Sequence, residues 1–164
     1  MRFFYALLTT VLISAFSSLA TEKPNILFVL FDDMGYGEPA SYRPASLFKT
    51  PNIDRMAKEG IRFTDAHSSA ASCTPTRYGF LTGRYPHRIG QFGVLSTFSP
   101  PLIHETRLTV ASYLKQNGYA TACIGKWHLG MNWDRPKTKG KNKTKKELKI
   151  GEKMKGGPNA VGFD

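Results

Sequence analysis

The chain has 164 residues, of which 41% are hydrophobic and 21% charged, with a formal net charge of +11. This length suffices to bury a modest domain core. Only two cysteines are present, so the chain can form at most one internal disulfide. The basic residues lack the interleaved aromatic side chains that stack on bases, which argues against a nucleic-acid partner.

Residues 1–20 have the composition of a secretory signal peptide. Arg2 supplies a positive start, residues 3–16 are mainly apolar, and residues 18–20 end in small side chains suited to signal peptidase. We expect cleavage before Thr21 and export to the periplasm, the cell exterior or, in a eukaryote, the lysosome. The signal peptide is then the only membrane contact. A retained anchor is the alternative, although the run is marginal for a membrane span.

Residues 24–31 form a continuous apolar run that predicts a strand buried on both faces. Asp32 and Asp33 follow it directly, where ligand sites lie in open α/β sheets. Adjacent carboxylates repel each other unless a cation neutralises them, and their hard oxygens suit Ca²⁺ or Mg²⁺. A solvated turn after a strand is the alternative for this pair.

The next segment alternates helix and strand. Thr50 is suited to an N-cap, Pro51 to the first helical position and Gly60 to the exit, which predicts a helix over 52–59. Residues 61–66 then predict a short strand. This alternation indicates an α/β layered fold with a largely parallel sheet flanked by helices.

Cys73 opens a further predicted helix. Thr74 is a candidate cap and Pro75 fits the first turn. A helix N-terminus favours anions, and Arg77, one turn on, offers a forked donor to a tetrahedral oxyanion at the same point. The pattern indicates a nucleophile beside an anion site, and a structural or disulfide-bonded cysteine is the alternative.

Apolar residues at helical spacing predict a helix over 108–117, which Gly118 ends. Residues 119–124 then predict a strand that contains Cys123. This thiol either pairs with Cys73 in a disulfide or, as we prefer, packs as a small hydrophobe.

Residues 125–130 predict a tight loop that carries an amine and an imidazole. Side chains two residues apart on an extended loop point the same way, so Lys126 and His128 are expected to converge on one site. A lysine there neutralises a bound anion, and a histidine transfers protons near neutral pH. The alternative is that both are solvent-exposed side chains that take no part in a site.

Residues 135–155 hold ten basic residues and two acidic ones, and therefore carry +8 of the net +11. Few of them are apolar, which predicts a lysine-rich insertion loop that does not fold alone. Attraction of a polyanion such as a sulfated polysaccharide is the functional alternative.

Three blocks together resemble one known family, the sulfatases of the alkaline phosphatase superfamily. Residues 73–77, Cys-Thr-Pro-Thr-Arg, with Leu-Thr-Gly-Arg at 81–84, resemble the first family motif. The Gly-Lys-Trp-His-Leu-Gly loop at 125–130 is similar to the second family motif. The predicted strand with its aspartate pair resembles the N-terminal strand and aspartate pair that bind the metal in the family. The resemblance implies an alkaline-phosphatase-like sulfatase fold for residues 21–164.

The resemblance also implies the chemistry. Cys73 would be oxidised to Cα-formylglycine by a formylglycine-generating enzyme, and its hydrated aldehyde would attack the sulfur of an aryl sulfate or a sulfated glycan. Asp32 and Asp33, with an oxygen of the modified residue 73, would bind a divalent cation, usually Ca²⁺ with Mg²⁺ possible.

The remaining roles follow from the same resemblance. Arg77 would hold the nucleophile, Lys126 would neutralise the sulfate and His128 would accept a proton. Sulfatases are several times longer, so we expect the chain to be an N-terminal part that lacks further ligands. A formylglycine-dependent phosphonate or phosphodiester hydrolase and an inert, exported polyanion-binding protein are the rival hypotheses.

Overall fold

The computed structural model describes residues 23–132 and 155–164. The predicted signal peptide and all but the last residue of the lysine-rich segment lie outside them. The chain divides into two compact units, Met1–Gly35 and Tyr36–Asp164. Within the described ranges, no helix is long and apolar enough to cross a membrane.

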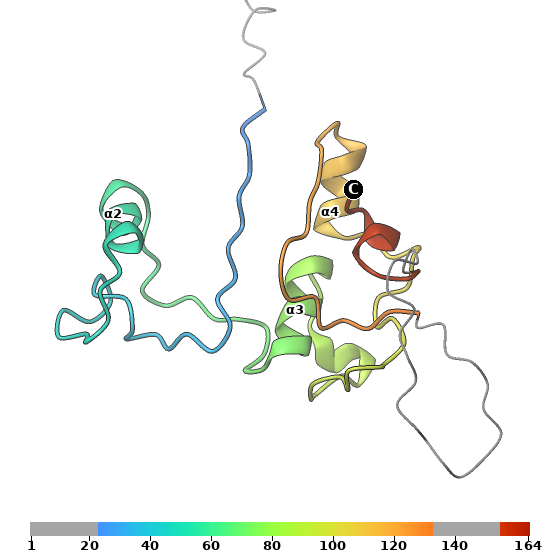
Figure 1. Ribbon diagram of the computed structural model, residues 1–164, viewed down its shortest axis with the longest axis horizontal. Helices are drawn as coiled ribbons and strands as arrows, with labels where there is room; N and C mark the ends of the chain where they lie inside the picture. The colour runs from blue at the N-terminus through green and yellow to red at the C-terminus, as the bar shows by residue number, and fades with distance from the viewer. Residues whose placement is uncertain (1–22, 133–154) are drawn as a thin grey trace, which may run out of the picture. The chain divides into compact units, whose positions relative to one another are not determined.

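In the first unit, the segment predicted as a buried strand has no strand assignment (Figure 1). The large apolar side chains from Ile26 to Phe31 are all exposed, Leu27 most of all at 88%. The expectation of burial on both faces is therefore wrong for the described chain. A strand is stabilised by ladder hydrogen bonds to neighbouring strands, and an apolar run alone does not supply them.

The second unit consists of short helices joined by long irregular segments. Its elements are α2 (Pro51–Glu59), α3 (Cys73–Thr82), η1 (Pro86–Ile89), α4 (Val110–Gln116) and η2 (Pro158–Val161). The predicted strands at 61–66 and 119–124 are not assigned as strands. The regular β pairing among the described residues is an isolated antiparallel bridge between Asn132 and Lys155.

Helix α2 confirms the prediction for 52–59 and begins one residue earlier, at Pro51. Thr50 holds the N-cap position, but its side chain makes no capping bond there. Its hydroxyl instead contacts the carboxylate of Asp54 at 3.2 Å. Gly60 ends the helix as expected, with its N–H donating to the Met56 carbonyl.

Helix α4 is shorter than the predicted 108–117 because a capping box fixes its start. The hydroxyl of Thr109 accepts the Ser112 N–H at 3.1 Å, and the Ser112 hydroxyl accepts the Thr109 N–H at 2.9 Å. This reciprocal pair satisfies two amide donors that the first helical turn leaves without carbonyl partners. The apolar spacing alone had placed the start two residues too early.

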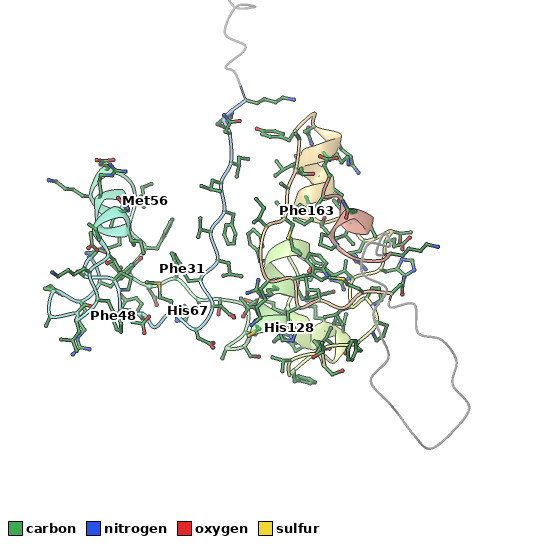
Figure 2. The ribbon with its side chains drawn as sticks, in the orientation of Figure 1. Phe31, Phe48, Met56, His67, His128 and Phe163 are labelled. Atoms are coloured by element: carbon green, nitrogen blue, oxygen red, sulfur yellow. The ribbon has the colours of Figure 1, made fainter. Side chains whose placement is uncertain are left out.

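The core of the second unit joins α3, the loop at 125–130 and η2. Its buried apolar members are Tyr78, Leu81, Ile103, Trp127, Leu129 and Val161. Phe163, which is labelled in Figure 2, packs its ring edge-on against Trp127, and the ring centroids lie 6.4 Å apart. The loop that carries Lys126 and His128 is therefore anchored through Trp127 and Leu129.

The segment after η2 is fastened to the segment after α4. The Asp164 N–H donates to the Thr121 carbonyl at 2.9 Å, and the Thr121 N–H donates to the Asp164 carboxylate at 2.8 Å. The Lys115 amine also contacts this carboxylate. These hydrogen bonds, that from Lys115 first, lower the pKa of Asp164 to about 2.

Candidate active site

Cys73 is the first residue of α3 and is partly buried. The predicted helix is confirmed, but the predicted cap is wrong. Ser72 occupies the N-cap position, and Thr74 lies inside the helix with no exposed surface. Both residues are of a type that caps helices, so the sequence alone did not distinguish them.

Close packing fixes the approach to Cys73. The Thr76 hydroxyl donates to the Ala70 carbonyl at 2.7 Å. A Cβ atom at Gly79 would lie 2.0 Å from the Ser69 hydroxyl oxygen, so only glycine lets this serine lie against α3. The serine-rich segment before the helix is thereby held on the helix that carries residue 73.

Buried and exposed side chains alternate along the loop at 125–130. Trp127 and Leu129 are buried at 9% and 1% exposure, whereas Lys126 is exposed and His128 is partly exposed. The Trp127 indole N–H donates to the Gly130 carbonyl at 2.9 Å and closes the loop. Lys126 and His128 therefore lie on the side away from the core.

Lys126 reaches the predicted nucleophile directly. Its Nζ atom lies 3.2 Å from the Sγ atom of Cys73. The Arg77 Nη1 group donates to the backbone carbonyl of Lys126 at 2.7 Å. Three of the four predicted catalytic residues are thus brought together, with the lysine charge at residue 73 and the arginine holding the lysine backbone.

His128 lies near the start of α3 (Figure 2), and its ring contacts the Leu95 carbonyl. Its Nε2 atom lies 2.9 Å from the Leu95 carbonyl, which can only accept, so Nε2 carries the proton. Nδ1 is buried and makes no hydrogen bond within the described part of the chain. In the neutral ring Nδ1 is therefore the nitrogen that accepts a proton.

His128 and Asp33 share an unusual backbone conformation. Their φ angles are 51° and 60°, and they are the two non-glycine residues with positive φ in the described ranges. Such conformations are costly and gather at functional sites. Both fall in the blocks that the sequence singled out. Asp32 and Asp33 belong to the first unit, so their meeting with residue 73 at a cation stays a prediction.

Cys73 and Cys123 are both thiols, so the alternative of a disulfide between them is wrong. Cys123 is exposed rather than packed in an apolar strand, which corrects the preferred expectation as well. Partial burial of its sulfur raises the pKa of Cys123, and the nearby Arg77 charge offsets part of this shift.

Sequence reasoning missed two contributors to this site, Thr74 and Leu95. The Thr74 hydroxyl donates to the His128 carbonyl at 2.9 Å and accepts the Leu95 N–H at 3.1 Å. No local pattern reveals these contacts, because they join segments 54 and 21 residues apart. The only signal was a threonine inside the Cys-Thr-Pro-Thr-Arg block.

Comparison with known proteins finds one family. The family model described as Sulfatase matches residues 24–160. An N-acetylgalactosamine-6-O-sulfatase of Bacteroides thetaiotaomicron is 43% identical over 111 residues, 68% of this chain and 22% of its own length. Human steryl-sulfatase is 45% identical over 121 residues, 70% of this chain and 21% of its own length. The chain thus spans less than a quarter of either relative.

A solved structure from work on glycosaminoglycan metabolism by Bacteroides thetaiotaomicron is also similar. It matches 88% of this chain and 28% of its own chain, with a TM-score of 0.71 and 36% sequence identity. This likeness confirms the predicted α/β, alkaline-phosphatase-like fold class, of which the chain matches an N-terminal part.

Proposed function

The chain belongs to the sulfatase family, and from this we propose that it contributes the nucleophile half of a site that hydrolyses sulfate esters. The observation that carries the proposal is the Lys126 ammonium 3.2 Å from the side chain of residue 73. This is the place where a sulfate attacked by residue 73 would carry its negative charge. A fixed cation there stabilises the charge as the transition state forms.

We propose further that Cys73 is converted to Cα-formylglycine by a formylglycine-generating enzyme. The donor set supports this. Asp32 and Asp33 offer hard oxygens that fit Ca²⁺ or Mg²⁺, whereas a thiolate is a soft ligand that these cations bind poorly. An oxygen-bearing residue 73 completes a hard set. The bound cation would supply charge stabilisation to the sulfate oxygens, and the hydrated aldehyde would supply the attacking hydroxyl.

The chain's own residues then have distinct tasks. Lys126 binds a sulfate oxygen through its ammonium group. Arg77 holds the Lys126 carbonyl and, with its remaining N–H groups, orients the side chain of residue 73. His128 accepts a proton at Nδ1, because its Nε2–H is committed to the Leu95 carbonyl.

For the substrate we propose an aryl sulfate or a sulfated glycan. The similar proteins are named for sulfates on an amino sugar and on a sterol, so the family accepts leaving groups of different chemistry. The apolar, small-residue-terminated segment at 1–20 supports export of the chain, whether secreted or periplasmic.

An aryl sulfate and an aryl phosphonate, assayed side by side, test the proposal. The complete protein that contains this half of the site, produced together with the formylglycine-generating enzyme, should release sulfate, and its Cys73→Ala variant should not. Faster phosphonate cleavage would favour the phosphonate hydrolase. Binding to a sulfated polysaccharide without sulfate release, with residue 73 unmodified, would contradict the proposal and favour the inert polyanion-binding protein.

A further inference from the structure

We propose that Thr74 is a positioning residue that holds the loop at 125–130 on α3 and thereby keeps the Lys126 amine at residue 73. Thr74 has no exposed surface. Its hydroxyl donates to the His128 carbonyl at 2.9 Å and accepts the Leu95 N–H at 3.1 Å. One side chain thus joins the nucleophile helix, the Lys126 loop and the segment at Leu95.

The hydrogen bonds of the Thr74 hydroxyl are neither a helix cap nor a bond within the helix. Ser72 holds the N-cap position. A threonine within a helix usually bonds the carbonyl four residues earlier, as Thr82 does with Tyr78 at 2.7 Å. Thr74 instead uses its donor and an acceptor lone pair on partners outside the helix. Its contacts are therefore tertiary, and they converge on the site.

Two side chains of α3 donate hydrogen bonds to alternate carbonyls of the loop. Thr74 binds the carbonyl of His128, and Arg77 binds that of Lys126 at 2.7 Å. Residues 74 and 77 lie one helical turn apart, on neighbouring positions of the helix surface. The carbonyls of residues 126 and 128 both face α3, since each accepts a hydrogen bond from one of its side chains. The helix thus fixes the loop at two points.

These two hydrogen bonds are needed to hold the loop, because its backbone is strained at His128 and the lysine side chain has many rotamers. His128 has a φ of 51°, which persists only where surrounding contacts impose it. The lysine side chain loses much rotamer freedom when its amine stays at residue 73. A loop released from Thr74 would let His128 relax and would move the Lys126 backbone relative to α3.

The inference rests on the proposed function for the importance of the contact, but its test needs no catalysis. o-Phthalaldehyde condenses with a thiol and a primary amine in contact, giving a fluorescent isoindole and two molecules of water. In a Cys123→Ser background without the maturation enzyme, Cys73 is the single thiol. Isoindole yield per folded molecule then reports how often the Lys126 amine lies at Cys73.

We expect Thr74→Val, which keeps the shape and removes the hydroxyl with both of its hydrogen bonds, to lower the yield at least about tenfold. Thr74→Ser should restore it. Thr82→Val, which removes a hydroxyl from the same helix, should leave it unchanged. Lys126→Met should abolish it, and a yield that survives this change would overturn the proposal.

Because Thr74→Val also weakens folding, its yield is compared with that of the parent chain in urea at the same native fraction. A lower yield in the variant supports positioning, whereas equal yields show a merely structural role and overturn the proposal. Absence of sulfate release would refute the proposed function and leave this result intact. The two proposals therefore fail separately.

Discussion

The side chain of residue 73 faces the ammonium group of Lys126, whose Nζ atom lies 3.2 Å from its Sγ atom. This amine belongs to a loop whose neighbouring side chains, Trp127 and Leu129, are buried in the core. Packing of these two neighbours therefore places the backbone that carries the charge. Such preorganised charge is the part of a site that lowers a barrier without reorganising during the reaction.

Removing this charge gives the first prediction. Lys126→Met should lower kcat for aryl sulfate hydrolysis by the matured protein about 10²–10³-fold, because a fixed cation at the developing charge is lost. Lys58→Met, which removes a lysine from the last turn of α2, is the matched control and should leave the rate unchanged. Steady-state rates check both, and equal rates for the two variants would refute the role of Lys126.

Part of this site was predictable at the level of the residue. The two-residue period of an extended loop predicted that Lys126 and His128 converge on one site, and the Lys126 amine does lie at residue 73. It did not predict that the His128 ring turns to Leu95, because that carbonyl lies 33 residues away. Side-chain direction depends on such tertiary partners, which no local pattern contains.

At the level of the element, turn and cap residues decide where helices begin and loops close. Thr109 makes a complete capping box, whereas Thr50 occupies the same position of α2 without a capping bond. Gly125 and Gly130 both have positive φ and bound the Lys126 loop. The two glycines differ in the space around them. The two threonines and the two glycines therefore each form a matched pair for mutation.

Loss of the cap is the second prediction. Thr109→Val should lower the free energy of unfolding by about 2–3 kcal/mol, because the Ser112 amide loses its acceptor and the Val161 carbonyl loses its donor. Thr50→Val should cost less, since no capping bond is lost. Urea unfolding followed by circular dichroism measures both. A larger loss at Thr50 would contradict the importance of the capping box.

The closing glycine of the loop gives the third prediction. A Cβ atom at Gly130 would lie 1.9 Å from the Pro100 carbonyl oxygen, whereas none of the surrounding atoms lies within 4 Å of one at Gly125. Gly125→Ala should cost about 1–2 kcal/mol through its backbone conformation alone. Gly130→Ala should cost more, because the segment at Pro100 must move. Similar losses in urea unfolding would show that the close approach is not maintained.

The helices were more predictable than the strands for a physical reason. A helix closes its hydrogen bonds within one segment, so α2 and α3 follow from caps, prolines and glycines near them. A strand depends on partners elsewhere in the chain. The apolar runs at 24–31 and 119–124 therefore indicated the α/β class of the family correctly. Neither run forms a strand in the described part of the chain.

At the scale of the whole molecule, the second unit is closed by contacts between distant segments. Val161 enters the core, and its carbonyl accepts the buried Thr109 hydroxyl at 2.6 Å. Asp164 then joins Lys115 and Thr121 across 49 and 43 residues. The segment after the lysine-rich run thus returns to the same core that anchors the Lys126 loop.

The charge of Asp164 gives the fourth prediction. Its pKa is lowered from 3.8 to about 2, so the folded chain binds this proton less readily than the unfolded chain. Its stabilisation is therefore complete above about pH 4 and is lost as the pH falls toward 2. Asp164→Asn should melt at a lower temperature than the parent chain at pH 5. Between pH 5 and pH 2, its melting temperature should then fall by less than that of the parent chain. Parallel curves would contradict the ion pair.

The central claim is that residue 73 acts as an oxidised nucleophile beside Lys126. Mass spectrometry of the tryptic peptide 63–77, from chain produced together with the formylglycine-generating enzyme, tests it most directly. We predict the mass of the aldehyde or its hydrate at residue 73, and the thiol mass when that enzyme is absent. An intact cysteine in both preparations would contradict the account.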